Sequence, residues 1–242
     1  MTQQTLNKLA PLIAIIGCDG SGKSTVSEEV LTFARRFGAA EAAHLGKQAG
    51  NIGRAIANLP LIGGLLGRII VAKTDKTRAQ RDKTSPGIFT ALIIYAFSLK
   101  RMHRFKRMLA LRRHGSIVVT DRFPQLELPG AYDSVELSTT ADNGLIVGWL
   151  ARCELRLYEW MTSYKPDLVI RLNVDLDTAC ARKPDHRREL LASKIAATPL
   201  LKFNGAPIVE IDSTQPLAVV IAEAKAAVAH TLTKRGYAQT NL

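Results

Sequence analysis

Short apolar runs alternate along this chain with longer segments in which apolar residues recur at helical spacing. Five runs have the length and composition of buried strands, namely 12–16, 40–45, 116–120, 167–172 and 207–212. The segments with helical spacing are 26–37, 88–113, 145–164, 177–183, 187–197 and 216–234. Strands that alternate with helices favour a parallel sheet, because each return to the starting edge needs a crossover connection. The pattern therefore predicts an α/β fold, a five-stranded parallel sheet with helices on both faces.

A glycine-rich turn joins the first predicted strand to the first predicted helix. It reads Gly-Cys-Asp-Gly-Ser-Gly-Lys-Ser-Thr over residues 17–25, which satisfies the phosphate-binding-loop pattern of Gly, four residues, Gly-Lys and Ser or Thr. Backbone N–H groups of such a loop surround a polyphosphate, and the positive end of the helix dipole faces it. Lys23 is expected to reach the β- and γ-phosphates, and Ser24 to ligate Mg²⁺. The expected nucleotide-binding residues are Gly17, Asp19, Gly20, Ser21, Gly22, Lys23, Ser24 and Thr25.

A charged pair, Asp121 and Arg122, directly follows the third predicted strand. Ligands of open parallel sheets bind at the carboxyl ends of the strands, so the pair is expected at the reaction centre. Asp121 would act as a general base or hold the metal through water, and Arg122 would clamp an anionic acceptor with two hydrogen bonds. Asp19 would accept a hydrogen bond from an acceptor hydroxyl. The simpler alternatives are a buried ion pair for Asp121 and Arg122 and a turn-forming role for Asp19.

A basic stretch at 182–188 separates the fourth and fifth predicted helices and contains Arg182, Arg187 and Arg188. Phosphoryl transfer needs positive charge on the equatorial oxygens of the transferred group and exclusion of water. A short basic lid with catalytic arginines would supply both functions. A solvated run of charge is the alternative interpretation.

The net charge of +12 indicates a polyanionic partner. No nucleic-acid motif accompanies the basic residues, so nucleic acid is not an expected partner. The basic cluster at 100–107 favours a solvated helix face, with peripheral contact to acidic lipid as the alternative. Three scattered cysteines, a polar N-terminus without a signal-peptide layout and the lack of a long apolar run favour the cytoplasm.

The loop at 17–25, the Thr-Asp-Arg-Phe sequence at 120–123 and the segment at 165–175 with the basic stretch after it resemble the thymidylate kinase family. The resemblance implies ATP and Mg²⁺ as cofactors, phosphoryl transfer to dTMP and a homodimer. It also implies that Asp19 and Arg122 contact the acceptor and that Lys100 or Arg101 lines the acceptor pocket. The family's Arg-Glu-Pro-Gly and Tyr-Gln-Gly segments are absent, so the resemblance is stronger on the ATP side than on the thymine side.

Together these features predict a single phosphate-loop kinase domain over 1–242, with a lid at about 182–188 and an acceptor-side insertion at about 46–86. The predicted function is ATP-dependent phosphoryl transfer to a small-molecule acceptor, with a nucleoside monophosphate as the leading candidate. A nucleoside or a cell-surface glycan sugar is the alternative acceptor. A nucleotide-binding switch without a small acceptor is the alternative from another class.

Overall fold

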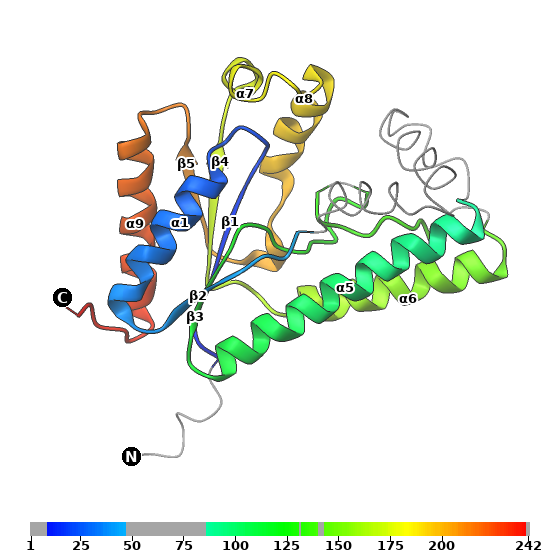
Figure 1. Cartoon of the computed structure of the whole chain (residues 1–242), viewed down its shortest axis with the longest axis horizontal. Helices are drawn as coiled ribbons and strands as arrows, with labels where there is room; N and C mark the ends of the chain where they lie inside the picture. Colours follow the sequence, from blue (N-terminus) through cyan, green and yellow to red (C-terminus); the bar gives the residue numbers. More distant parts are fainter. Residues whose placement is uncertain (1–8, 47–85, 131, 140–142, 241–242) are drawn as a thin grey trace, which may run out of the picture.

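The computed structural model describes residues 9–46, 86–130, 132–139 and 143–240, and most of the predicted acceptor-side insertion at 46–86 lies outside these residues. Its central element is one five-stranded sheet in the order β2-β3-β1-β4-β5. Every neighbouring pair of strands is parallel (Figure 1). The strands are β1 Leu12–Gly17, β2 Ala40–Ala43, β3 Ile117–Thr120, β4 Leu168–Asn173 and β5 Ile208–Asp212. The predicted α/β fold with a five-stranded parallel sheet is confirmed.

The second strand is shorter than the sequence predicts. We expected it to cover 40–45, but β2 ends at Ala43. Its partner β3 ends at Thr120, the residue that faces Ala43, so no hydrogen-bonding partner exists in the sheet beyond that point. His44 and Leu45 therefore leave the ladder at the carboxyl end of the sheet. Leu45 turns into the core, whereas His44 stays partly exposed.

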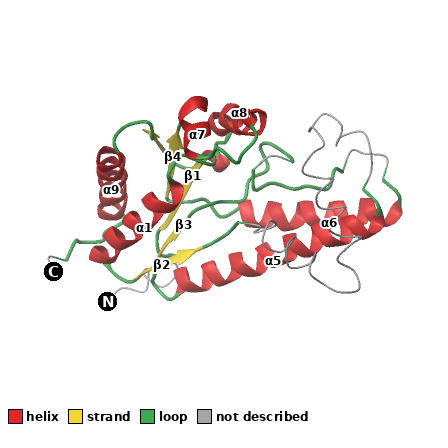
Figure 2. Cartoon of the chain, turned by 45° about the horizontal axis from the view of Figure 1, so that its top comes forward, coloured by secondary structure: helices red, strands yellow, loops and turns green. Residues whose placement is uncertain are grey.

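One face of the sheet is covered by α1 Lys23–Ala34 and α9 Leu217–Lys234. Along β1, Ile13 and Ile15 point to this face, because successive side chains of a strand alternate between the two sides. They pack with Val30 of α1 and Val228 of α9 in a core of fully buried aliphatic side chains. Figure 2 shows the two helices together on this side.

The opposite face is covered by α5 Ile88–Arg113 and α6 Leu145–Thr162. Leu12 and Ala14 of β1 point to this side, and Phe105 of α5 packs edge-on against Phe123 and Trp160. The two helices run in the same direction, since Ser98 donates to Glu154 (2.6 Å) and Arg101 to Tyr158 (2.9 Å), both near a constant offset along the chain. Helices on both faces, as predicted, are thus confirmed.

Two short helices, α7 Leu176–Arg182 and α8 Arg188–Ala197, stand over the carboxyl end of the sheet (Figures 1 and 2). The predicted break between two helices in this basic region is confirmed, and every residue from 181 to 190 is exposed. The turns η2 Arg35–Phe37, η3 Thr198–Leu200 and η4 Phe203–Gly205 complete the short elements. Within the described ranges, no helix combines the length and apolar character that a bilayer crossing needs.

Candidate functional site

The loop between β1 and α1 has the backbone geometry of an anion site. Gly22 adopts φ +83°, in the left-handed region, and α1 begins at the next residue without a side-chain cap. The N–H groups of the first helical turn therefore point outward and remain available to a ligand. Gly17 is required for close packing, because a Cβ there would lie 2.7 Å from the carbonyl oxygen of Leu172. The predicted loop is thus formed as a cradle of backbone donors.

Lys23 is folded back into this loop, where its Nζ donates to the carbonyl oxygen of Cys18 at 2.5 Å. Burial lowers the pKa of Lys23 to about 8, with Asp19 opposing the shift and the positive charge of Arg122 adding to it. A bound polyphosphate would supply the missing negative charge. The site is therefore electrostatically prepared for an anion.

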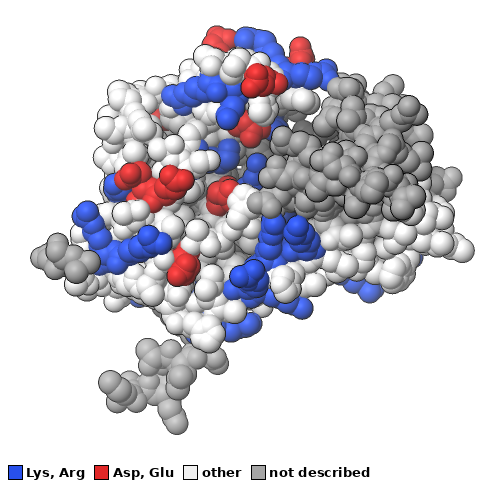
Figure 3. All heavy atoms as spheres, viewed as in Figure 1, with Lys and Arg blue, Asp and Glu red and all other residues white. Residues whose placement is uncertain are grey.

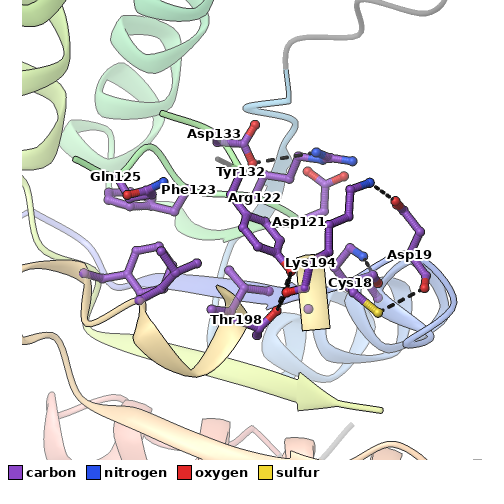
Figure 4. A pocket seen from close by; sticks show the side chains of 15 residues that line it. Cys18, Asp19, Asp121, Arg122, Phe123, Gln125, Tyr132, Asp133, Lys194 and Thr198 are labelled. Atoms are coloured by element: carbon purple, nitrogen blue, oxygen red, sulfur yellow. Dashed lines mark hydrogen bonds and ion pairs between the residues drawn. The ribbon is translucent and has the colours of Figure 1, made fainter. Parts of the chain in front are cut away.

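Two cavities meet at this lysine. The outer cavity follows the loop and is lined by Gly20, Gly22, Ser24, Thr25, His44, Gly46, Glu136, Arg182 and Lys183. The inner cavity has an apolar and partly aromatic floor, formed by Ile16, Phe123, Leu201 and Phe203, with Gly17, Cys18, Gln125 and Thr198 beside it. Both are lined by Asp19, Lys23, Asp121, Arg122, Tyr132, Asp133 and Lys194. Figure 4 shows the inner cavity. A ligand on the phosphate loop and a second ligand in the inner cavity would thus meet at Lys23.

Asp121 lies at this junction and is held by a residue that sequence reasoning had not assigned to the site. His44 Nδ1 lies 2.8 Å from Asp121 Oδ2. The other oxygen, Oδ1, is buried and has no hydrogen-bond partner among the residues that the structure describes. The available signal was that His44 follows β2, whose carboxyl end neighbours that of β3.

Arg122 also lies at the junction, with its guanidinium 3.7 Å from a carboxylate oxygen of Asp133. Asp133 is shared, because the buried Arg101 donates to its carboxylate and, at 2.8 Å, to its carbonyl oxygen. The expectation that Arg101 lines the acceptor pocket is therefore wrong. Arg101 is only 1% exposed and lines neither cavity, and it holds Asp133 from the protein interior. Lys100, the other expected residue, is exposed to solvent on α5 and also lines neither cavity.

Asp19 contacts a second residue that the sequence did not single out. Lys194 of α8 donates to Asp19 Oδ2, and His186 Nε2 lies 4.0 Å from the same oxygen. Burial alone would raise the pKa of Asp19, but the hydrogen bond from Lys194 and the charge of nearby Lys23 outweigh it and lower that pKa. Tyr132 fixes the backbone of Lys194 by donating to its carbonyl oxygen at 2.5 Å (Figure 4). Since Lys194 comes from α8, only the fold reveals this contact.

The three arginines of the basic stretch lie in different environments. Arg182 donates to the carbonyl oxygens of Gly20 (3.2 Å) and Ser213 (3.0 Å) and lines the outer cavity. Arg188 pairs instead with Asp177 of α7 at 2.8 Å, and Arg187 lies 4.0 Å from Glu189. The structure thus brings Arg182 to the phosphate loop and places Arg187 and Arg188 outside both cavities.

Comparison with known proteins agrees with this picture at the level of the family. No protein-family model matches the chain. The chain is similar to two Escherichia coli K12 proteins, each named as an uncharacterized ATP-binding protein. It is 45% identical to YghS over 207 residues, covering 85% of this chain and 86% of YghS. It is 40% identical to YghR over 223 residues, covering 92% of this chain and 88% of YghR. This chain therefore belongs to the family of ATP-binding proteins that includes YghS and YghR.

Proposed function

We propose that this protein is an ATP-dependent phosphotransferase that acts on a small acceptor. The observation that supports it is the pair of cavities that share Lys23, one along the phosphate loop and one over an apolar floor. A donor and an acceptor bound in the two cavities would bring their reacting groups together at this lysine. Positioning of that kind and electrostatic stabilisation are the main needs of phosphoryl transfer.

ATP is the proposed donor. The chain has an uncapped α1 N-terminus and a partly buried lysine in the loop, and its relatives YghS and YghR are named as ATP-binding proteins. Mg²⁺ fits beside the loop, because Ser24 and Asp121 both line the outer cavity and Asp121 Oδ1 has no partner among the described residues. When bound, the ion would neutralise charge on the β- and γ-phosphates. The described residues contain no cluster of three His, Cys, Asp or Glu side chains for a metal, so phosphate and water oxygens would complete its coordination.

A nucleoside monophosphate is the proposed acceptor, in line with the resemblance to thymidylate kinases. The inner cavity has Arg122 and Lys194 on one side, which suit a phosphate group. Phe123 and Phe203 on its floor, packed edge-to-face with ring centroids 6.3 Å apart, suit a planar base. Asp19 would contact the sugar or orient Lys194.

A hydroxyl acceptor, on a nucleoside or a sugar, is the second candidate and rests on a different observation. An alcohol must lose a proton on phosphorylation, whereas a phosphate monoester is already ionised near neutral pH. A carboxylate that holds Nδ1 of a histidine leaves Nε2 free to accept that proton, and His44 and Asp121 have this arrangement at 2.8 Å. The pair lines the outer cavity together with Lys23.

The exposed segment at 182–188 is proposed as a lid over the donor. Arg182 already contacts the loop at Gly20, so a small movement would bring it to a phosphate oxygen. For Arg188 to reach the donor, its ion pair with Asp177 must break. Because this pair is exposed, breaking it costs little free energy. Hydrogen exchange of this segment with and without a non-hydrolysable ATP analogue tests the lid. Equal exchange in the two states would contradict it.

The function is tested by measuring ADP release from ATP and Mg²⁺ over a panel of nucleoside monophosphates, nucleosides and sugars, with dTMP included. Lys23→Ala is the control, because it removes the charge at the reaction centre and is expected to lower turnover on the order of 10³-fold. Turnover with one acceptor class identifies the substrate. ATP binding without acceptor-dependent ADP release would reject the transferase and favour a nucleotide-binding switch.

A further inference from the structure

The parallel helices α5 and α6 both begin at the same distal end of the molecule and run from there toward the sheet (Figures 1 and 2). Their first turns expose large apolar side chains: Ile88 (50%), Phe89 (62%) and Leu92 (46%) on α5, and Leu145 (93%), Ile146 (52%) and Trp149 (55%) on α6. Scattered exposed apolar residues are common on protein surfaces. Six of them on adjoining turns of two helices form a patch, the kind of surface that marks an interaction site. We call these six residues the apolar tip.

The exposed face of α5 changes character along its length. Its buried face is formed by Ala91, Ile94, Ser98, Arg101, Phe105, Met108, Leu109 and Arg112. On the opposite side, exposed residues fall within one arc of the helix at about 3.6 residues per turn. On this side, the first half of the helix exposes Ile88, Phe89, Leu92, Ala96 and Leu99, and the second half exposes Lys100, His103, Lys106, Arg107 and, at its end, Arg113. One continuous stripe is thus apolar near the tip and basic toward the sheet.

The charge of this helix has one sign. Residues 88–113 contain seven Lys and Arg and no Asp or Glu. Two of the seven, Arg101 and Arg112, are buried, and the other five leave the second half of the helix with positive charge alone. On the face seen in Figure 3, blue side chains without red neighbours gather over the middle of α5. An ordinary solvated helix face would mix both signs.

We propose that the apolar tip and the basic stripe of α5 bind the surface of a membrane that contains anionic lipid. Apolar side chains with an aromatic residue beside a cationic face suit the boundary between headgroups and acyl chains. Trp149 is the residue type that favours this boundary, and Phe89 and Leu145 would add buried apolar area. Lys100, Lys106 and Arg107 would lie against the phosphates of the headgroups. Nucleic acid would use the basic half alone and leave the apolar tip without a partner.

The test is co-sedimentation of the full chain with vesicles of phosphatidylcholine alone and with about a third phosphatidylserine, at moderate salt. Binding is expected to the anionic vesicles only. Lys106→Gln with Arg107→Gln should weaken it about 25-fold, since each basic group near such a surface contributes a factor of about five. Phe89→Ser with Leu92→Ser should weaken it at least about tenfold. All four side chains are exposed, so the fold should be retained.

Matched variants elsewhere on the surface control for charge and hydrophobicity. Lys202→Gln with Lys234→Gln removes the same charge, and Leu217→Ser with Val219→Ser removes exposed apolar groups from α9. Both control pairs should bind like the unaltered chain. No binding to anionic vesicles, or equal loss in the controls, would overturn the proposal. So would a self-associated protein that turns monomeric with Phe89→Ser and Leu92→Ser but does not sediment with vesicles, because the tip would then bind a second copy.

Discussion

The donor side and the acceptor side of the site are built in different ways. The donor side is one loop, residues 17–25, in which backbone N–H groups and a single lysine form the cradle. The acceptor side collects side chains from the segment that follows β3, from Tyr132 and Asp133, from α8 and from the turns after it. Backbone recognition needs only glycines at the right spacing, whereas side-chain recognition needs a complete fold. The contrast suggests that the donor is common to the family's fold and that acceptor choice depends on a few exchangeable contacts.

The largest expected effect concerns Arg101, whose buried ion pair with Asp133 supports the acceptor side and not the donor loop. Arg101→Met leaves the carboxylate of Asp133 without its buried partner and should cost on the order of 3 kcal/mol of stability. Urea unfolding measures this loss. Because Arg101 lies behind the cavity, ATP affinity of the folded fraction should be unchanged while acceptor KM rises.

Lys100→Met is the matched control for Arg101, since it removes a neighbouring positive charge that is exposed on the same helix. Its stability should change by less than about 0.5 kcal/mol. Equal destabilisation by both variants would mean that the helix, and not the ion pair with Asp133, determines the loss.

The same contrast explains what the sequence could predict. The strands, the helices and the phosphate loop depend on periodicity and on contiguous residues, so the five-stranded parallel sheet and the position of Lys23 were predicted. His44 and Lys194 were missed because each reaches its partner across a long stretch of chain, 77 residues in one case and 175 in the other. The pattern around 100–101 predicted a basic helix, but only the packing of α5 on α6 decides that Arg101 points inward. Most of the segment at 46–86 lies outside the described residues, so the prediction of an acceptor-side insertion stays a prediction.

The next test separates the two acceptor classes. His44→Gln keeps a hydrogen-bond donor and acceptor near Asp121 but removes a group that can take up a proton. With a hydroxyl acceptor, kcat should fall about 100-fold, because general base catalysis commonly contributes that much. With a monophosphate acceptor, kcat should change little. The acceptor found in the ADP-release panel is the one to use, and ATP affinity of the variant provides the control. A large fall with a phosphate acceptor would contradict a proton-transfer role for His44.

Lys194→Met tests whether an acceptor anion is held from the α8 side. The variant removes the positive charge and keeps the length of the side chain, and Tyr132 and Thr198 still hold the backbone carbonyl of this residue. Acceptor KM should rise about tenfold, as expected for one charge-assisted hydrogen bond, while ATP affinity stays near its original value. Lys202→Met, a change of an exposed lysine outside both cavities, is the control. A tenfold loss of ATP affinity in Lys194→Met would place this lysine on the donor side.

The smallest expected effect is a change in the number of protons taken up on ATP binding, and not a change in a rate. Burial lowers the pKa of Lys23 to about 8, so without nucleotide about half of this lysine should be protonated at pH 8. The unfolded chain, in which the pKa is the usual 10.5, binds more protons between pH 8 and 10.5, so this group's contribution to stability increases as the pH rises through that range. A polyphosphate favours the charged form, and its binding at pH 8 should therefore draw up to about half a proton onto Lys23. Calorimetry of ATP binding in two buffers of different ionisation enthalpy measures the uptake. Lys23→Met, which has no titrating group there, gives the protons exchanged by the nucleotide itself. An identical proton balance for the two proteins would show that Lys23 is already fully charged before the nucleotide binds, and the donor side would then be less prepared for its anion than the structure indicates.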